Sequence, residues 1–198
     1  MTKQPTIPSV SVQYQRTGAS TKFNALGMRV MQERAFAYRG EQYLLIKSPP
    51  ASGKSRALMF IALDKLNNQG IKQALIVVPE RSIGGSFADE PLSQYGFHWD
   101  WTVKPEWNLC NAPGIDEPRV AQSKVKAVKA FLNGDDKVLV CTHATFRFAV
   151  EELGVAAFDN RLIAVDEFHH VSASIDNVLG AQVKDLTARD KVHLVAMT

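Results

Sequence analysis

The feature that most constrains the fold is a set of short aliphatic runs that no polar alternation interrupts. Unbroken runs of this kind are typical of strands that are covered on both faces. The five runs are Tyr43–Ile46, Ala74–Val78, Val138–Cys141, Leu162–Val165 and Val192–Ala196. They predict an α/β fold with a parallel sheet, because parallel strands need crossover connections that place helices on both faces. Ligands of such sheets bind at the carboxyl ends of the strands.

Helical spacing of apolar residues predicts helices at Leu26–Tyr38, Lys54 to about Asn68, and Thr145–Leu153. Residues 1–25 are rich in Ser, Thr, Gln and Pro without a sustained period, and we expect a loosely held arm there. Residues 26–198 then form one domain.

Residues 97–118 are harder to interpret, since three tryptophans stand among prolines and asparagines. Short strands are candidates at Trp101–Lys104 and Asn108–Cys110. The tryptophans could stack on nucleic-acid bases, but core packing is the favoured interpretation.

Composition excludes few functions. The 198 residues are 45% hydrophobic and 22% charged, as in an ordinary globular protein. The net charge of +3 is compatible with a polyanionic partner without requiring one. Cys110 and Cys141 show no metal-site spacing, and no secretory signal or membrane-spanning run is apparent. We therefore expect a cytoplasmic protein that does not contact a membrane.

Ser48-Pro49-Pro50-Ala51-Ser52-Gly53-Lys54-Ser55 follows a predicted strand and opens a predicted helix, which is the setting of a phosphate-binding loop. Backbone N–H groups at the helix start would face the phosphates, with Lys54 supplying a positive charge and Ser55 a magnesium ligand. Ser48 stands where the usual motif has its first glycine. The alternative is an ordinary helix start, with Gly53 in a turn and Ser55 as the cap.

Asp166 and Glu167 follow the aliphatic run at Leu162–Val165. At a strand end beside a phosphate loop, Asp166 would hold magnesium, and Glu167 would orient and deprotonate the attacking water. The alternative is a solvated acidic pair. All of this depends on folding that brings Lys54 and the Asp166-Glu167 pair together around one magnesium triphosphate.

These motifs carry a specific resemblance. Asp166-Glu167-Phe168-His169 resembles the DExH form of motif II in superfamily 2 helicases, and Ser48–Ser55 resembles their motif I, commonly APTGSGKT, with Ala51 replacing a glycine. The family resemblance implies a RecA-like P-loop NTPase domain that uses ATP and Mg²⁺. It is strongest toward DEAD/DEAH-box helicases related to type I and type III restriction subunits.

Weaker matches cover most of the chain. Gly27–Gln32 resembles the segment in which a glutamine, here Gln32, reads adenine, and Ile76–Arg81 resembles motif Ia. Val140–Thr145 resembles motif Ib and its neighbours, and Ala196–Thr198 resembles the start of motif III. The nucleotide site implied by the resemblance comprises Gln32, Ser48, Pro49, Pro50, Ala51, Ser52, Gly53, Lys54, Ser55, Arg56, Asp166 and His169.

The resemblance also implies nucleic-acid contacts by Arg81, Thr142 and Thr145. Each weaker match has a structural alternative: Gln32 as a surface residue, Thr145 as a helix N-cap and His169 as a surface histidine. His143 and His170 are expected to be structural or solvated.

In this family a second RecA-like domain follows motif III and supplies a catalytic arginine. Because the chain ends at Thr198, within motif III, we expect it to bind ATP but hydrolyse it weakly without that domain. The expected partners are DNA or RNA, the second domain of the parent chain, and a nuclease or other restriction-system subunit. The alternatives are a nucleotide-dependent switch that unwinds nothing, and a P-loop phosphotransferase, for which the sequence shows no acceptor pocket or Arg-rich lid.

Overall fold

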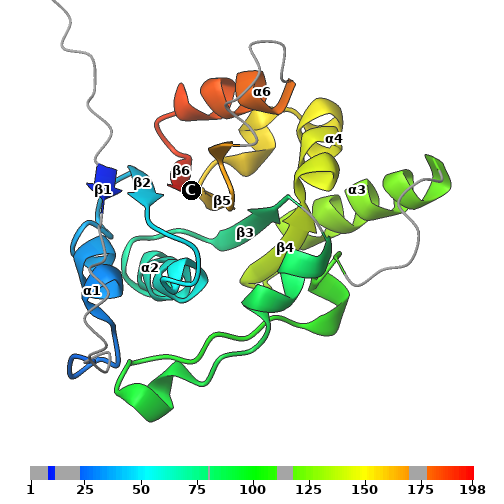
Figure 1. The fold of residues 1–198 in the computed structure, drawn as a ribbon. Helices are drawn as coiled ribbons and strands as arrows, with labels where there is room; N and C mark the ends of the chain where they lie inside the picture. The colour runs from blue at the N-terminus through cyan, green and yellow to red at the C-terminus, as the bar shows by residue number, and fades with distance from the viewer. Residues whose placement is uncertain (1–8, 12–22, 80, 111–117, 170–177) are drawn as a thin grey trace, which may run out of the picture.

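The computed structural model describes residues 9–11, 23–79, 81–110, 118–169 and 178–198. Its centre is a six-stranded sheet in the order β1-β2-β6-β5-β3-β4, and every neighbouring pair is parallel (Figure 1). The strands are β1 (Ser9–Ser11), β2 (Tyr43–Lys47), β3 (Gln73–Val78), β4 (Val138–Thr142), β5 (Arg161–Val165) and β6 (His193–Met197). All five predicted strands are present, each shifted or extended by only one residue at either end.

Five described α-helices cover the sheet, α1 and α2 on one face and α3, α4 and α6 on the other (Figure 1). The helices are α1 (Val30–Ala37), α2 (Lys54–Asn68), α3 (Pro118–Asn133), α4 (His143–Leu153) and α6 (Val178–Thr187). Alternate residues of β3 show the double burial: Ile76 and Val78 join the core under α2, while Leu75 and Val77 join the core under α3 and α4. The continuous aliphatic runs are therefore buried on both faces, as predicted.

The arm expected over residues 1–25 is not loose at Ser9–Ser11. These residues form β1, which pairs with β2 from Ser9 opposite Leu45 to Ser11 opposite Lys47, and Val10 is buried. A three-residue strand with one apolar side chain gives no periodic signal in the sequence. Its pairing with β2 supplies the order.

The first helix begins at Val30, four residues later than predicted. Asn24 accounts for the difference, because its Oδ1 accepts hydrogen bonds from the backbone N–H groups of Leu26 and Met28. Gly27 follows in the left-handed region, with φ +71°. This side-chain turn competes with helix and delays its start.

Residues 81–110 connect β3 toward α3 through 3₁₀ turns rather than strands. The turns are η1 (Arg81–Phe87), η2 (Leu92–Tyr95) and η3 (Pro105–Trp107); a fourth, η4 (Val155–Phe158), precedes β5. The expected strands at Trp101–Lys104 and Asn108–Cys110 are wrong, because only isolated bridges form at Trp101 and Asn108.

The three tryptophans belong to the packed structure. Trp101 is fully buried, and its indole N–H donates to the carbonyl of Phe87. Trp107 donates to Asp136 and packs edge-on against Phe131. Trp99 packs edge-on against Phe97. Core packing, the favoured interpretation, is confirmed for Trp101, while Trp99 and Trp107 are partly buried and pack against the two cores.

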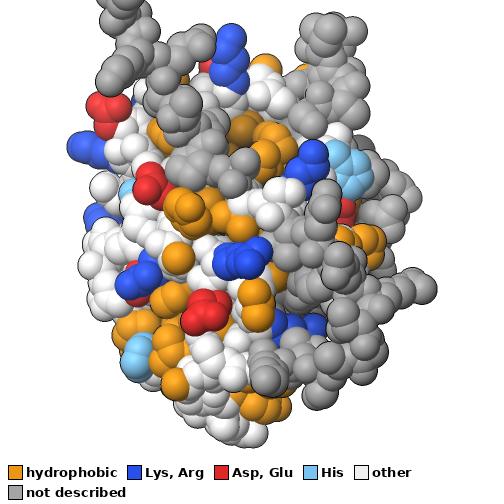
Figure 2. Space-filling view, turned by 60° about the vertical axis from the view of Figure 1, so that its left-hand side comes forward, with side chains coloured by type: hydrophobic (Ala, Val, Ile, Leu, Met, Phe, Trp, Pro, Cys, Tyr) orange, Lys and Arg blue, Asp and Glu red, His pale blue; other side chains and the backbone are white. Residues whose placement is uncertain are grey.

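Surface charge is mixed. On the face shown in Figure 2, the described side chains intersperse hydrophobic, basic and acidic groups, with no broad field of one sign. This agrees with the small net charge of +3. None of the described helices has the length and apolar character that crossing a membrane would require.

Candidate nucleotide site

The predicted nucleotide-binding segments meet at the carboxyl edge of the sheet. The phosphate loop follows β2, Asp166 and Glu167 follow β5, and Thr198 follows β6, which lies between them. Backbone hydrogen bonds join the three segments: Ser48 N–H donates to the carbonyl of Thr198 at 3.0 Å, and Phe168 N–H donates to Met197 at 2.7 Å. The strand order thus places the three motifs side by side.

Lys54 and Glu167 lie together, as the prediction required. The Lys54 Nζ is 3.9 Å from Glu167 Oε1 and donates to the backbone carbonyl of Ser48 at 3.2 Å. Asp166 adjoins Glu167 in sequence and is almost wholly buried. The Lys54 ammonium group therefore lies between the phosphate loop and the acidic pair. A triphosphate bound there would bring negative charge to Lys54, and its metal ion would bring positive charge to the acidic pair.

The loop backbone is held in a conformation that an ordinary helix start does not need. Ala51 and Gly53 both have positive φ, +60° and +88°. Gly53 is the N-cap of α2, and no side chain caps the helix there. Ser55 is therefore not the cap, so this part of the alternative is wrong, whereas Gly53 does lie in a turn at the helix start, as the alternative had it. The amides of the first helical turn remain directed toward the loop.

Two buried hydroxyls test whether the loop fits a phosphate. Ser48 Oγ and Ser52 Oγ are buried, and neither has a hydrogen-bond partner among the described residues. Buried hydroxyls are normally satisfied, and this pair would gain hydrogen-bond partners from a ligand that offers acceptor oxygens. The first turn of α2 also contains no acidic residue. Orphaned hydroxyls, a free helix start and one lysine fit a phosphate chain. Pro49, Pro50 and Ala51 are exposed on the outside of the loop.

Asp166 lies in an environment in which a bound cation would stabilise its charged form. Burial raises the pKa of its carboxyl, and the neighbouring Glu167 charge acts in the same direction; the Glu167 N–H and Lys54 act against them. The Glu167 N–H donates to Asp166 Oδ1 at 2.9 Å. No cluster of three metal-ligating His, Cys, Asp or Glu side chains exists in the described ranges. One carboxylate with the Ser55 hydroxyl fits magnesium, which takes few protein ligands and completes its shell with phosphate and water.

Two histidines contact the acidic motif. His169 Nδ1 lies 3.0 Å from Thr198 Oγ1 and 3.2 Å from Glu167 Oε2, so it joins motif II to the start of motif III. The structure thus brings His169, which the resemblance placed in the nucleotide site, into contact with Glu167 and Thr198. His143 Nε2 lies 3.0 Å from the backbone carbonyl of Asp166, which agrees with the structural role expected of it. His170 lies outside the described residues.

Gln32 adjoins the phosphate loop and is not a surface residue, since only 1% of it is exposed. Its Nε2 donates to the Gly53 carbonyl at 3.1 Å, and its Oε1 accepts from the Arg29 N–H at 2.8 Å. Arg29 was not predicted as a site residue. A Cβ on Gly53 would lie 3.8 Å from its Nη1, and its guanidinium lies over the Phe23 ring at 5.9 Å. The signal in the sequence that could have pointed to Arg29 is its position three residues before Gln32.

Arg56 and the candidate nucleic-acid contacts Arg81, Thr142 and Thr145 are the remaining predicted site residues. Arg56 directs its guanidinium away from the loop, to the carbonyl of Gly27 and to Glu90, so the structure does not bring it to the phosphate side.

Thr142 is the N-cap of α4 and accepts a hydrogen bond from the Thr145 N–H, so the capping role belongs to Thr142. Both threonine hydroxyls are buried and face each other at 3.1 Å. The Arg81 side chain lies outside the described residues, and the nucleic-acid roles stay predictions.

The chain is similar in sequence to known proteins. The DEAD/DEAH box helicase family model matches residues 29–198. The chain is 52% identical over 189 residues to the Bacillus subtilis (strain 168) protein named "Putative ATP-dependent helicase YeeB", covering 96% of this chain and 30% of that protein. The chain therefore spans less than a third of that relative.

Solved helicase structures share the fold at low sequence identity. The Pyrococcus furiosus Hef helicase domain matches with TM-score 0.58 and 21% identity, covering 86% of this chain and 32% of that one. The DUF1998 helicase MrfA bound to DNA and AMPPNP matches with TM-score 0.54 and 16% identity, covering 86% and 24%. The parallel sheet flanked by helices is thus the RecA-like fold. The family match, which extends over most of the chain and includes both motifs of the site, shows that the chain belongs to the DEAD/DEAH box helicase family.

Proposed function

We propose that this domain binds ATP with Mg²⁺ at the carboxyl edge of its sheet and hydrolyses it to drive movement on DNA or RNA. The observation that carries the proposal is the 3.9 Å approach of Lys54 to Glu167, beside a loop with two orphaned buried hydroxyls. Family membership supports ATP-dependent chemistry at this edge.

The phosphate end is assigned to the loop and α2. Lys54 places its charge on the β- and γ-phosphates, while the Ser48 and Ser52 hydroxyls and the first amides of α2 donate to phosphate oxygens. Asp166 and Ser55 hold magnesium, which would neutralise charge on the phosphates. Binding then supplies the hydrogen-bond partners that the two serine hydroxyls lack.

Glu167 is the proposed general base. It would accept a proton from water as the water oxygen attacks the γ-phosphorus and the bond to the β-phosphate oxygen breaks, leaving ADP and phosphate. Lys54 and His169 lie on either side of its carboxylate, at 3.9 Å and 3.2 Å. Both contacts restrict where the carboxylate points.

Gln32 is the proposed reader of the base. One N–H and one lone pair of its carboxamide are used on Gly53 and Arg29, which leaves one of each for a purine edge. A glutamine carboxamide pairs with the N6 donor and N7 acceptor of adenine, whereas guanine presents acceptors at both positions. Arg29 and the half-exposed Phe23 ring flank this place.

The polymer and the remaining partners are proposed from relatives. The MrfA structure contains DNA together with AMPPNP. We assign DNA or RNA as the substrate of the whole protein, with Arg81, Thr142 and Thr145 as candidate contacts. A second RecA-like domain would complete the site with an arginine, and a nuclease or restriction-system subunit would act with the motor.

A fluorescent ATP analogue titrated into the 198-residue chain tests the proposal. Magnesium-dependent binding is expected, and Lys54→Ala should weaken it about 10- to 100-fold, as for the loss of a charge-assisted contact. Lys72→Ala, at the opposite edge of the sheet, is the control. Absence of nucleotide binding by the wild type would overturn the proposal.

Turnover gives a second test. Since the arginine of a second domain is worth about 10³- to 10⁵-fold in related enzymes, this chain should hydrolyse ATP slowly, and the full-length parent should respond to nucleic acid. Efficient hydrolysis by the chain alone, without nucleic acid, would contradict that division of labour. A parent that hydrolyses ATP but never moves or unwinds would be a switch.

A further inference from the structure

Arg56 stands in the first turn of α2, two residues beyond Lys54, yet its side chain reaches across to two other segments. Its Nη1 donates to the Gly27 carbonyl at 2.9 Å, and its Nε lies 3.3 Å from Glu90 Oε1. The guanidinium lies over the Tyr95 ring at 4.7 Å and over the Phe60 ring at 5.3 Å. One cation therefore joins α2 to the segment before α1 and to the segment after β3.

These contacts complete a closed ring around the base end of the proposed site. From Arg56 the ring passes to Gly27, along the chain to Arg29, and through the Arg29 N–H to Gln32 Oε1. Gln32 Nε2 then donates to Gly53, three residues before Arg56. Without the bond from Arg56 to Gly27, the hydrogen bond from Gln32 to Gly53 would lose the second connection that closes the ring.

The segment after β3, which contains Tyr95 and Gly96, packs directly against the segment before α1. A Cβ on Gly27 would lie 2.4 Å from the Tyr95 carbonyl oxygen, and one on Gly96 would lie 2.1 Å from the Ala25 carbonyl oxygen. The two backbones are therefore in direct contact, with no space for side chains at either glycine. In Figure 1, residues 81–110 (green) pass beneath α2 toward the chain that precedes α1. Only Arg56 among the described cations bonds both segments to α2.

We propose that Arg56 is a positioning residue for base recognition, which fixes Gln32 relative to the phosphate loop and so sets the preference for adenine over guanine. The inference rests on the proposed nucleotide site. It assigns Arg56 no contact with the nucleotide, in place of the direct contact that the motif resemblance implied. The planar guanidinium of Arg56 combines one hydrogen bond, one ion pair and contacts with two aromatic rings, and lysine does not reproduce this.

The experiment compares Arg56→Lys with wild type in three titrations, each with Mg²⁺: ATP, GTP and inorganic tripolyphosphate. The preference for ATP over GTP should fall about tenfold in the variant, as expected for the loss of the charge-assisted hydrogen bond from Arg56 to the Gly27 carbonyl. Tripolyphosphate affinity should stay within about twofold, because the phosphate ligands are untouched.

Arg39→Lys is the matched control. Arg39 makes the same kinds of contact near the other end of α1: a carbonyl (Phe36, 3.2 Å), a carboxylate (Asp64, 3.4 Å) and an aromatic ring (Phe36, 4.5 Å). Its substitution should cost comparable stability and leave the ATP to GTP ratio unchanged. A ratio that falls equally in both variants would reduce Arg56 to a general stabilising residue.

Glu90→Gln supplies a second variant that keeps Arg56 and removes only its ion pair. The ratio should fall about two- to threefold, consistent with a partly exposed pair. A folded Arg56→Lys protein that retains the wild-type ratio, or loses tripolyphosphate affinity in parallel, overturns the inference alone. A wild type that binds tripolyphosphate without preferring ATP also overturns it, whereas a wild type that binds neither ligand overturns the proposed function.

Discussion

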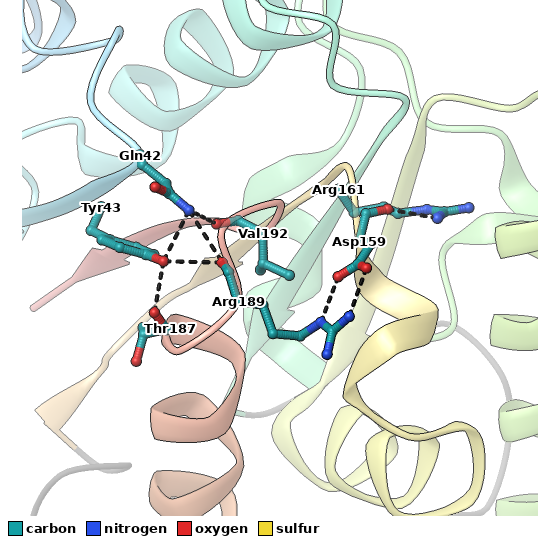
Figure 3. Close-up of polar contacts among 7 residues, drawn as sticks. All are labelled: Gln42, Tyr43, Asp159, Arg161, Thr187, Arg189 and Val192. Carbon is teal, nitrogen blue, oxygen red and sulfur yellow. Dashed lines mark hydrogen bonds and ion pairs between the residues drawn. The ribbon is translucent and has the colours of Figure 1, made fainter.

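The two edges of the sheet use their polar groups in opposite ways. At the amino edge, side chains donate to backbone carbonyls at the ends of helices and turns. Gln42 donates to the carbonyls of Arg189 and Val192, and the Tyr43 hydroxyl donates to Thr187, as Figure 3 shows. Arg189 and Asp159 form a two-pronged ion pair at 2.6 and 2.7 Å in the same view. These groups are bonded to one another and to the backbone inside the protein.

The polar groups of the carboxyl edge differ from those of the amino edge. Two buried serine hydroxyls lack partners among the described residues, and Asp166 is buried with a raised pKa. The described non-glycine residues with positive φ include two here, Ala51 and Glu167. Strained backbone and unpaired polar groups cost stability, and they persist where surrounding structure enforces them. The difference supports the proposal that the polar groups of the amino edge stabilise the domain and those of the carboxyl edge bind the nucleotide.

Substitution of the proposed base should separate these roles most strongly. Glu167→Gln keeps shape and removes the proton acceptor, so ATP turnover by the full-length parent should fall about 10²- to 10⁴-fold. Nucleotide affinity and melting temperature should hardly change. Phosphate release and a fluorescent-nucleotide titration measure the two effects, and a variant that turns over normally would remove Glu167 from the chemistry.

A pair of glycines tests the strained loop. Gly53 has φ +88°, and a Cβ there would lie 2.6 Å from Gln32 Nε2, so Gly53→Ala should weaken ATP binding about tenfold. Gly70, beyond the other end of α2, has φ +71° but open space around it. Gly70→Ala and Gly53→Ala should each cost about 1 kcal/mol of stability, because both glycines have positive φ, but Gly70→Ala should leave ATP affinity unchanged. Equal affinities in the two variants would show that the loop geometry is irrelevant to binding.

Arg161 tests the amino edge. It donates to the carbonyls of Leu132 and Asp159 and to the Gln73 side chain. Arg161→Met should lower the free energy of unfolding by about 2–4 kcal/mol, because three acceptors lose their donor. Urea denaturation measures this loss. ATP affinity should stay within about twofold, and a parallel fall in affinity would erase the distinction between the edges.

The pH response should also come from the amino edge. Burial, together with the Lys65 charge, lowers the pKa of His193 to about 4. The unfolded chain binds a proton on this histidine below pH 6.5, and the folded chain resists it, so stability is lost as pH falls from about 6.5 toward 4. Allowing for its partial exposure, His193 should contribute roughly 1–2 kcal/mol to that loss. His193→Gln should flatten this part of a denaturation profile, and an unchanged slope would contradict the assignment.

Sequence information was sufficient where local pattern and function coincide. The strands β2 and β5 could be predicted because both of their faces are buried, and α2 was predicted at Lys54 to about Asn68 from the helical spacing of its apolar residues. β1 was missed because Ser9–Ser11 depends on pairing with β2. The helix α3 was not predicted, although the spacing of its buried Val125, Val128 and Phe131 carried a signal.

The site divided in the same way. Lys54 and Glu167 follow from motifs, since each stands directly after a predicted strand or turn. Arg29 and His143 were not predicted as contacts of the site, because what they touch depends on tertiary packing. The direction of Arg56 depends on Gly27 and Glu90, which are 29 and 34 residues away along the chain. No local periodicity encodes such contacts.

The most direct test of a shared magnesium triphosphate site is a double-mutant cycle on MgATP affinity, measured by calorimetry with Lys54→Ala, Asp166→Asn and the double variant. If one ligand contacts both residues, the double variant should lose at least about tenfold less affinity than the product of the single losses. The Asp166→Asn effect should vanish without magnesium. Losses that multiply independently, or an Asp166→Asn protein with wild-type MgATP affinity, would contradict the site.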